Sequence, residues 1–325
     1  MSTYKVLFTD PPSPELTEER AALAAIGAEV VVASKPEPDC FIREAADADV
    51  VVNRFAPVTR AYIEATTHCK MIIRTGIGVD SIDVAAATEK GIMVSCVPDY
   101  CREEVADHTV ALSLGIARRL RTYDTRVRQG QWVPVGVGYV PRLSETIYGI
   151  MGFGNIARMV AHRMQGFGCR IMAYDPYLPD SVFTDANVAR AQTPEEIFRA
   201  ADFVSLNLPL TEETRHMVNK DTLAMMKPTA FIINTGRGPL ICQADLLEAL
   251  ENHVIAGAGL DVLENEPLAA GDPLGKLDNV LLSPHAAFYS QESLPDLNRK
   301  TLQEVIRALK GEPLHTWINR PRSEK

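Results

Sequence analysis

Three polar residues in the second half of the chain are of the types that carry out proton and carboxylate chemistry: Arg237, Glu266 and His285. An arginine presents a planar fork that grips a carboxylate, and a histidine exchanges a proton near neutral pH. A carboxylate beside that histidine holds its tautomer and favours imidazolium. The combination predicts hydride transfer to a 2-oxo acid, in which Arg237 binds the substrate, His285 protonates the oxygen and Glu266 pairs with His285.

Each of these residues follows a short apolar segment with the composition of a buried strand. These three segments are residues 230–234, 257–261 and 280–282, and a fourth of the same kind, residues 201–206, precedes them. Near-continuous apolar strands indicate a parallel sheet covered on both faces. Ligands bind beyond the carboxyl ends of such strands, so the loops are expected to converge on one crevice. A single arginine, glutamate or histidine on a loop is usually an ordinary surface residue, and only the joint placement favours a site.

A glycine-rich turn stands upstream of these strands. Residues 148–151 form an apolar strand, Gly152, Gly154 and Ala157 then fit the pattern G-x-G-x-x-G/A, and a helical pattern follows. The next strand, residues 170–174, ends at Asp175, where an acid can bond both ribose hydroxyls of NAD. An ordinary turn between strand and helix is the alternative. We predict an NAD site, with NAD preferred over NADP because no arginine is adjacent to Asp175 in the sequence.

Composition bounds the class of protein. The chain has 325 residues, 46% of them hydrophobic, and a net charge of −9. At about 150 residues per domain this length suggests two domains. No basic cluster favours nucleic acid as a partner, and no apolar run reaches the roughly 18 residues of a membrane span. The N-terminus lacks the apolar stretch of a signal peptide, so we expect a cytoplasmic protein. The six cysteines contain no C-x-x-C pair and are expected to be free thiols, with no metal bound.

The first half of the chain predicts a second parallel sheet. Its strands are expected at residues 5–9, 30–33, 49–52, 71–74 and 92–97, with a helix at 15–26. One long helix from Glu103 to about Gln129 is expected to connect the domains, and a helix at 297–310 to return and pack on the first sheet.

The predicted fold is therefore α/β, with two doubly wound parallel-sheet domains. A Rossmann NAD-binding domain, residues 100–291, is expected to be inserted into a flavodoxin-like substrate domain formed by residues 1–99 and 292–325. We expect the active cleft between the domains, with hinges near residues 98–101 and 288–293.

Over essentially its whole length the chain resembles the D-isomer-specific 2-hydroxyacid dehydrogenases. The resemblance rests on residues 74–83, the glycine turn, and residues 234–238, 261–267 and 284–285. It implies that Arg237 binds substrate, that His285 is the acid and base, and that Glu266 pairs with it. It further implies that the amides of Ile77 and Gly78 help hold the substrate carboxylate.

The resemblance also implies that Asp261 contacts the nicotinamide carboxamide. Asn207 stands where many relatives have histidine, and Gly236 where many have alanine; both are expected to be tolerated. The residues expected at the NAD site are Gly152, Phe153, Gly154, Asn155, Ile156, Asp175, Asn207, Leu208, Pro209, Thr214, Thr235, Gly236, Asp261 and Cys101.

Within the family, residues 97–107 and 285–290 most resemble the branch that holds the C-terminal-binding-protein corepressors, with phosphoglycerate dehydrogenases next. Phosphoglycerate dehydrogenases place a substrate-binding arginine where this chain has Asn53, and Arg54 is its neighbour. Asn53 and Arg54 are therefore both candidates for contact with the substrate, and a solvent-facing Arg54 is the alternative. We therefore expect an uncharged, small to medium 2-oxo acid rather than phosphohydroxypyruvate. Phe288 is expected to wall the substrate side chain; packing at a hinge is the alternative.

Three rival functions remain open: an NAD-responsive protein-binding scaffold of the corepressor kind with incidental turnover, a phosphoglycerate dehydrogenase, and formate or phosphite oxidation. A panel of 2-oxo acids separates them. Residues 130–141 are too apolar for a free loop, so we expect them to pack on a second subunit in a homodimer.

Overall fold

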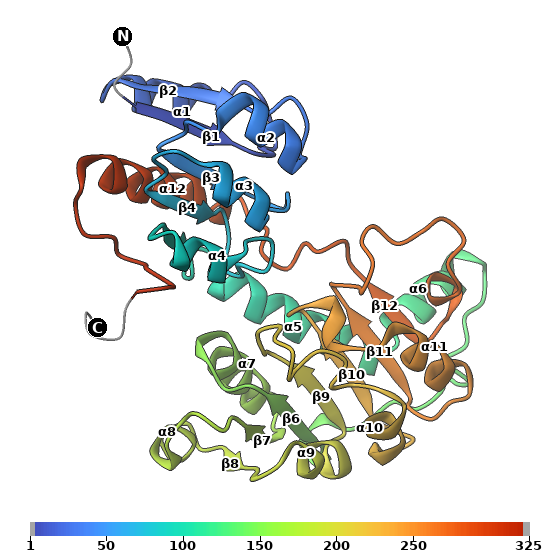
Figure 1. Ribbon diagram of the computed structural model, residues 1–325. Helices are drawn as coiled ribbons and strands as arrows, with labels where there is room; N and C mark the ends of the chain where they lie inside the picture. The colour runs from blue at the N-terminus through green and yellow to red at the C-terminus, as the bar shows by residue number, and fades with distance from the viewer. Residues whose placement is uncertain (1–3, 321–325) are drawn as a thin grey trace. The chain divides into compact units, whose positions relative to one another are not determined.

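A computed structural model describes residues 4–320. The chain divides into two compact units: Met1–Cys101 together with Ser290–Lys325, and Arg102–Tyr289. Each unit is built on its own parallel β-sheet with helices between the strands (Figure 1). None of the helices in the described part of the chain combines the length and the apolar character needed to cross a membrane.

The first unit contains a five-stranded sheet in the order β2-β1-β3-β4-β5, with parallel pairing throughout. This order is the flavodoxin-like one. Its strands are β1 (Tyr4–Phe8), β2 (Ala28–Val32), β3 (Val50–Asn53), β4 (Met71–Arg74) and β5 (Met93–Cys96). Its helices are α1 (Thr17–Ala24), α2 (Pro38–Ala45), α3 (Arg60–Ala65), α4 (Val84–Glu89) and α12 (Ser293–Lys310).

Helices cover both faces of this sheet. Phe41 of α2 and Tyr62 of α3 pack edge to face in a core cluster that includes Val51 and Ile72 from the central strands. Helix α12 contacts β3, β4 and α1. The predicted return of the last helix onto the first sheet is thereby confirmed, although α12 begins at Ser293, four residues earlier than expected.

The second unit contains a seven-stranded parallel sheet in the order β12-β11-β10-β9-β6-β7-β8. Its strands are β6 (Ile147–Met151), β7 (Arg170–Tyr174), β8 (Ala189–Arg190), β9 (Phe203–Leu206), β10 (Phe231–Asn234), β11 (Gly257–Leu260) and β12 (Val280–Leu282). Its α-helices are α5 (Arg102–Ala117), α6 (Leu120–Arg128), α7 (Asn155–Gly166), α8 (Asp180–Asp185), α9 (Pro194–Ala200), α10 (Lys220–Met225) and α11 (Gln243–Glu251). Short 3-10 turns lie at Leu143–Glu145, Gly238–Leu240 and Pro273–Lys276.

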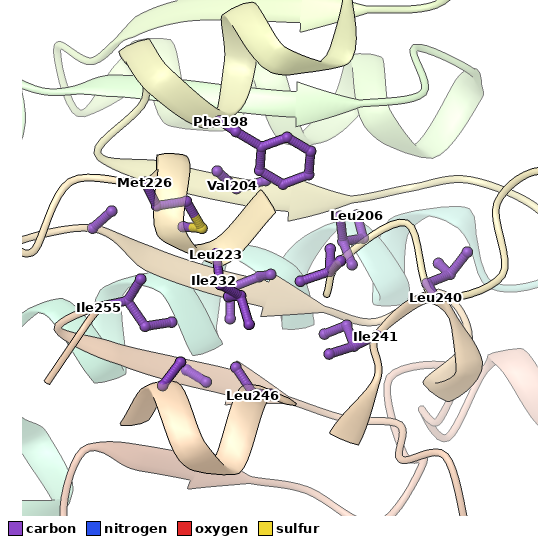
Figure 2. Packing of buried hydrophobic residues seen from close by; sticks show 14 of the residues in the cluster. Phe198, Val204, Leu206, Leu223, Met226, Ile232, Leu240, Ile241, Leu246 and Ile255 are labelled. Carbon is purple, nitrogen blue, oxygen red and sulfur yellow. The ribbon is translucent and has the colours of Figure 1, made fainter. Parts of the chain in front are cut away.

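Every residue of β9, β10 and β11 is buried, because this sheet too is covered on both faces. Helices α5 and α7 pack on one face, around Phe203 and Phe231, whose rings stack at 5.2 Å between centroids. Helices α9, α10 and α11 pack on the other face, and Figure 2 shows Phe198, Leu223 and Leu246 from these helices packed against the strand residues. Both clusters consist of apolar side chains, whose burial is the main source of stability in such a layer.

The strand order reverses between β6 and β9. From β6 the chain moves outward through β7 and β8, and then returns to the other side of β6 to continue through β9. A crevice forms at the carboxyl ends of strands at such a switch point and is where ligands bind in open α/β sheets. The glycine turn after β6 and the loop after β9 therefore occupy the expected binding position.

One prediction about this unit was wrong. The single helix expected from Glu103 to Gln129 is two helices, α5 and α6, separated where Arg119 adopts a left-handed conformation with φ of 55°. Arg119 is buried, lies over the Phe231 ring and bonds the carbonyls of Tyr139 and Ala256, so tertiary contacts favour the break. The short strand β8 was not predicted. In the first unit, the helix expected at residues 15–26 is confined to Thr17–Ala24.

Candidate active site

The glycine turn after β6 is shaped by the loop after β9. Gly152 has a φ of 79°, and a Cβ atom on it would lie 2.6 Å from the carbonyl oxygen of Asn207. The Asn207 amide in turn donates to the Met151 carbonyl at 2.8 Å. Only glycine fits both this backbone conformation and this approach, which explains the residue at the first position of the motif.

Asp175, at the end of β7, holds the same turn from the other side. One carboxylate oxygen accepts from the Phe153 amide at 2.9 Å, and the other accepts from the Tyr177 amide at 3.0 Å. The Phe153 ring is fully buried and stacks on Phe183 at 5.1 Å. Phe153 can therefore face a cofactor only through its backbone, and Asp175 is both the candidate ribose ligand and a support of the turn.

Helix α7 begins at this turn with its first amides unsatisfied by a cap. Gly154 is the N-cap residue and makes no side-chain cap, and no atom lies within 4 Å of the place where a Cβ on it would stand. Asn155 and Ile156 open the first turn of the helix. An uncapped helix N-terminus beside open space is suited to a pyrophosphate, so the residues present fit a bound dinucleotide.

The loop after β9 carries the other expected cofactor residues, Asn207, Leu208, Pro209 and Thr214. The Asn207 side-chain amide donates to Ser205 Oγ at 3.0 Å. The Thr214 hydroxyl donates to the Pro209 carbonyl at 2.7 Å and accepts from the Thr211 amide at 2.8 Å. Thr214 thus closes the loop on itself, and its hydroxyl is engaged within the chain.

Arg237 stands after β10 in a loop held by side-chain contacts at both ends. The Asn234 side chain accepts from the Gly236 amide at 3.0 Å and donates to the Arg237 carbonyl at 2.9 Å. Thr235 is held by Thr109 of α5, whose hydroxyl lies 2.7 Å from the Thr235 hydroxyl. The Arg237 guanidinium is half-buried and donates to the Gly236 carbonyl at 2.8 Å. The loop therefore fixes the base of the arginine side chain.

His285 and Glu266 come together after β12 and β11. Glu266 Oε2 lies 2.8 Å from His285 Nδ1, and Glu266 Oε1 accepts from the Leu263 amide at 3.0 Å. A carboxylate bound at Nδ1 leaves Nε2 as the ring nitrogen that exchanges a proton with a ligand.

The charge on Glu266 is favoured by this contact. Burial alone would raise the pKa of Glu266, but hydrogen bonds from His285 and the Leu263 amide lower it below its ordinary value. Glu266 is therefore ionised at neutral pH and presents a negative charge to His285 Nδ1.

Asp261, at the end of β11, is nearly fully buried and anchors the turn that carries His285. Its Oδ1 accepts from Ser283 Oγ at 2.5 Å and from the Ala286 amide at 2.9 Å, and its Oδ2 accepts from the Ala287 amide at 2.9 Å. Burial would raise the pKa of Asp261, but the donors, with His108 and Ser283 the strongest, lower it to about 2. The resemblance implies that Asp261 contacts the nicotinamide carboxamide. The Asp261 carboxylate would then bind the carboxamide in addition to the donors that it already accepts from within the protein.

In the first unit, the residues after β4 present two backbone donors. Among residues 4–320, the amides of Ile77 and Gly78 have no hydrogen-bond acceptor within the chain, and both residues are half-buried. The preceding residues are held, since the Thr75 amide donates to Asn53 at 2.7 Å and the Gly76 carbonyl accepts from Val97 at 2.9 Å. A pair of adjacent open amides is the arrangement that binds a carboxylate.

The structure does not favour Asn53 as a substrate ligand. Its side chain is fully buried, donates to Thr9 and Ala56, and accepts from Ser81 at 2.7 Å. These bonds engage both ends of the amide, so Asn53 ties β1 and β3 to neighbouring loops. Arg54 is half-buried, with its guanidinium 4.9 Å from the centre of the Phe55 ring.

Phe288 lies beside the candidate acid and base. Its ring centroid is 6.4 Å from that of His285, with the rings at 72°, an edge-to-face contact. Cys101, by contrast, is buried, with 1% of its surface exposed at the end of the first unit. A side chain so enclosed offers a cofactor little surface.

Two features of this site were missed in the sequence. His108 of α5 contacts Ser283 and Asp261, and nothing in the spacing of residues so far apart indicates it. Arg190 of β8 bonds the Asp175 carbonyl and the Asp180 carboxylate, so an arginine does lie near Asp175 in space. The Arg190 guanidinium is, however, engaged by the Asp180 carboxylate.

Comparison with known proteins gives a family for this arrangement. Residues 110–287 match the family model described as "D-isomer specific 2-hydroxyacid dehydrogenase, NAD binding domain". The matched stretch contains the glycine turn, Asp175, Arg237, Asp261, Glu266 and His285.

Relatives align over most of the chain. A glyoxylate reductase of Korarchaeum cryptofilum is 38% identical over 87% of this chain and 86% of its own length. A D-3-phosphoglycerate dehydrogenase of Methanocaldococcus jannaschii is 36% identical over 98% of this chain, which spans only 60% of that relative's length. Among solved structures, D-lactate dehydrogenase of Aquifex aeolicus, complexed with NAD and lactic acid, has a TM-score of 0.88 at 25% identity, covering 98% of this chain and 99% of its own.

Proposed function

This chain belongs to the D-isomer-specific 2-hydroxyacid dehydrogenase family of NAD-dependent oxidoreductases, and we propose that it interconverts a small, uncharged 2-oxo acid and its D-2-hydroxy acid. The observation that carries the proposal is the 2.8 Å contact between His285 Nδ1 and Glu266 Oε2, in the same unit as a turn that fits a dinucleotide. A proton donor beside a nicotinamide site is what carbonyl reduction requires.

The residues of this chain take distinct roles in the proposed reaction. NAD, when bound, supplies or accepts the hydride at C2. Arg237 grips the substrate carboxylate, because its fork matches two oxygens. His285 donates the proton to the carbonyl oxygen from Nε2, while Glu266 holds Nδ1 and stabilises the imidazolium. In the oxidative direction His285 accepts that proton instead.

Two observations support an uncharged substrate side chain. Asn53, which stands where phosphoglycerate dehydrogenases carry a substrate-binding arginine, is buried and engaged within the first unit. Phe288 places an apolar ring beside His285, where it would meet the side of the substrate away from its carboxylate. We therefore propose glyoxylate, pyruvate or a small apolar homologue as substrate.

The test is a panel of 2-oxo acids assayed with NADH and with NADPH. Glyoxylate, pyruvate, hydroxypyruvate, 4-methyl-2-oxopentanoate and phosphohydroxypyruvate cover small, apolar and charged side chains. We expect NADH-dependent turnover of at least one uncharged acid, and loss of about 10²- to 10⁴-fold in kcat in His285→Ala. Slow turnover of all five acids would instead favour a scaffold with incidental activity.

Phosphoglycerate dehydrogenase activity is the second candidate, favoured by the relative from Methanocaldococcus jannaschii that aligns over nearly all of this chain. Phosphohydroxypyruvate turned over well above pyruvate would establish it and would point to Arg54 as the phosphate ligand.

We also propose a homodimer. In residues 130–141, Trp132 is 85% exposed and Val135 70% exposed, an apolar surface larger than an isolated side chain provides. A second copy packed on this segment would remove it from water. Light scattering at micromolar concentration tests this, and a monomeric mass would refute it.

A further inference from the structure

A hydrogen-bonded chain of three side chains supports the turn that carries His285. Ser283 Oγ donates to Asp261 Oδ1 at 2.5 Å, and His108 Nε2 lies 2.8 Å from the same Ser283 Oγ. A serine has one proton to donate and gives it to the carboxylate, so its oxygen accepts from His108, and Nε2 carries the hydrogen. The same nitrogen is 3.5 Å from Asp261 Oδ1. His108 is therefore the donor at the head of this chain.

Asp261 connects this hydrogen-bonded chain to the backbone around His285. The Asp261 carboxylate accepts from the amides of Ala286 and Ala287, and its carbonyl accepts from the His285 amide at 2.7 Å. His285 itself has a φ of 53°, in the left-handed region. That conformation costs a residue other than glycine on the order of 1 kcal/mol and persists only where its surroundings hold it.

The buried charge on Asp261 needs all of these donors. Asp261 is 2% exposed, and a carboxylate removed from water must be satisfied by hydrogen bonds. Burial acts to raise its pKa, and hydrogen bonds led by His108 and Ser283 bring that pKa down to about 2. Removing the donor on α5 would leave the serine and the carboxylate with fewer bonds and free them to rearrange.

We propose that His108 is a positioning residue for His285, acting through Ser283 and Asp261 to hold the left-handed turn in place. The inference rests on the proposed function and deepens it. The catalytic imidazole is then held from two sides: Glu266 bonds its ring, and the His108 chain fixes its backbone.

The test compares two replacements of His108 in two backgrounds, with glyoxylate and NADH. His108→Leu removes the donor, whereas His108→Gln keeps an N–H at similar reach. A misplacement of about 1 Å can cost 10²-fold, so we expect kcat to fall roughly 10- to 100-fold in His108→Leu and less than about threefold in His108→Gln. His162→Leu, at an exposed position of α7, is the matched control for loss of a helical histidine and should change kcat less than twofold.

The second background is His285→Ala. If His108 acts through His285, His108→Leu should lower the residual activity of His285→Ala by less than about twofold, because the group that it positions is gone. Equal losses in both backgrounds would overturn the proposal and indicate a general structural role. An increase in the Kd for NADH in proportion to the loss of kcat would also overturn the proposal, because it would show that His108→Leu acts on cofactor binding.

Hydrogen exchange tests the same turn without any turnover. We expect the amides of Ala286 and Ala287 to exchange about tenfold faster in His108→Leu, and amides of β9 to be unchanged. If the wild-type protein reduces none of the 2-oxo acids, the proposed function fails, and the exchange measurement still decides the role of His108. Unchanged exchange would refute it. If His108→Leu does not fold, Ser283→Ala breaks the same chain one bond further on and carries the same expectations.

Discussion

Replacing Gly238 with alanine should push apart the two loops that carry Arg237 and Glu266. Gly238 directly follows Arg237 and is buried against the backbone of Leu263 and Glu264, two to three residues before Glu266. A Cβ on Gly238 would lie 1.8 Å from the Leu263 carbonyl oxygen, 2.0 Å from its carbon and 2.6 Å from the Glu264 nitrogen. All three are backbone atoms, so no side-chain rotation relieves the overlap.

The size of the effect follows from that distance. Ordinary contact begins at 3.4 Å, so the loops must separate by about 1.6 Å from the present 1.8 Å. A shift of about 1 Å in a catalytic group costs about 10²-fold in rate, which is roughly 2.7 kcal/mol in the barrier. Overpacking of this kind also lowers the free energy of unfolding by about 1 to 3 kcal/mol.

Steady-state kinetics with glyoxylate, NADH binding and thermal unfolding together measure these effects. We expect kcat/KM of Gly238→Ala to fall about 10²-fold, Tm to fall by several degrees, and the Kd for NADH to change less than about threefold, because the glycine turn at Gly152 is separate. Gly166→Ala is the matched control: Gly166 is helical, and no atom lies within 4 Å of its added Cβ. It should keep kcat/KM within twofold.

The reasoning would be refuted if Gly238→Ala retained kcat/KM within threefold of the wild-type value while folding normally. That result would mean that the spacing of the two loops does not control the reaction. A large fall in Tm with unchanged kcat/KM would show that the overlap lowers stability but does not affect catalysis.

Three further predictions concern charge. Glu266→Gln replaces the carboxylate that contacts His285 Nδ1 with a neutral amide, so kcat for oxo-acid reduction should fall, and an unchanged kcat would exclude Glu266 from the mechanism. Asp175→Ala should narrow the preference for NADH over NADPH and raise the KM for NADH, since Phe153 loses its acceptor; a wild-type enzyme equally efficient with both cofactors would contradict the assignment. Folding lowers the pKa of Asp261 from 3.8 to about 2. At about 1.36 kcal/mol per pKa unit, its ionisation contributes roughly 2.4 kcal/mol to the free energy of unfolding. Because the pKa of Asp261 is lower in the folded state, its contribution to the free energy of unfolding is present above pH 4 and is lost as pH falls towards 2. Urea unfolding from pH 5 to 2 should show this loss in the wild-type protein and not in Asp261→Asn.

The sequence predicted what depends on local pattern. The buried strands were recognisable because each is near-continuously apolar, and Gly152, Gly154 and Asp175 kept the spacing of a dinucleotide turn. The family, the two-sheet fold and the NAD cofactor were confirmed by the matching family model and by the solved structures. The roles of Arg237, Glu266 and His285, the homodimer and the cytoplasmic location stay predictions.

What the sequence did not predict depends on contacts between distant residues. Arg119 breaks the connecting helix because carbonyls more than 15 residues away bond its guanidinium, and the helical periodicity runs through that point without a signal. Asn53 was placed by alignment to a substrate position, yet its amide bonds to Thr9, Ala56 and Ser81, which only the packed sheet brings together. The same holds for His108 and Ser283, 175 residues apart.

The return of α12 to the first sheet has a consequence for synthesis. Helix α12 covers β3 and β4, and the residues after it finish the edge of that sheet: the Ile318 amide donates to the Val94 carbonyl, and the Val94 amide donates to Asn319. All of these residues are translated after the 188 residues of Arg102–Tyr289. At about 5–20 residues per second, the ribosome spends roughly 10 to 40 s on that stretch. During this time the first five strands have left the ribosome without the helix that covers them. Chaperones bind apolar surface of the kind that such an uncovered sheet exposes. Nascent chains of this protein should therefore need protection until α12 emerges, even though the second unit already has its complete sequence.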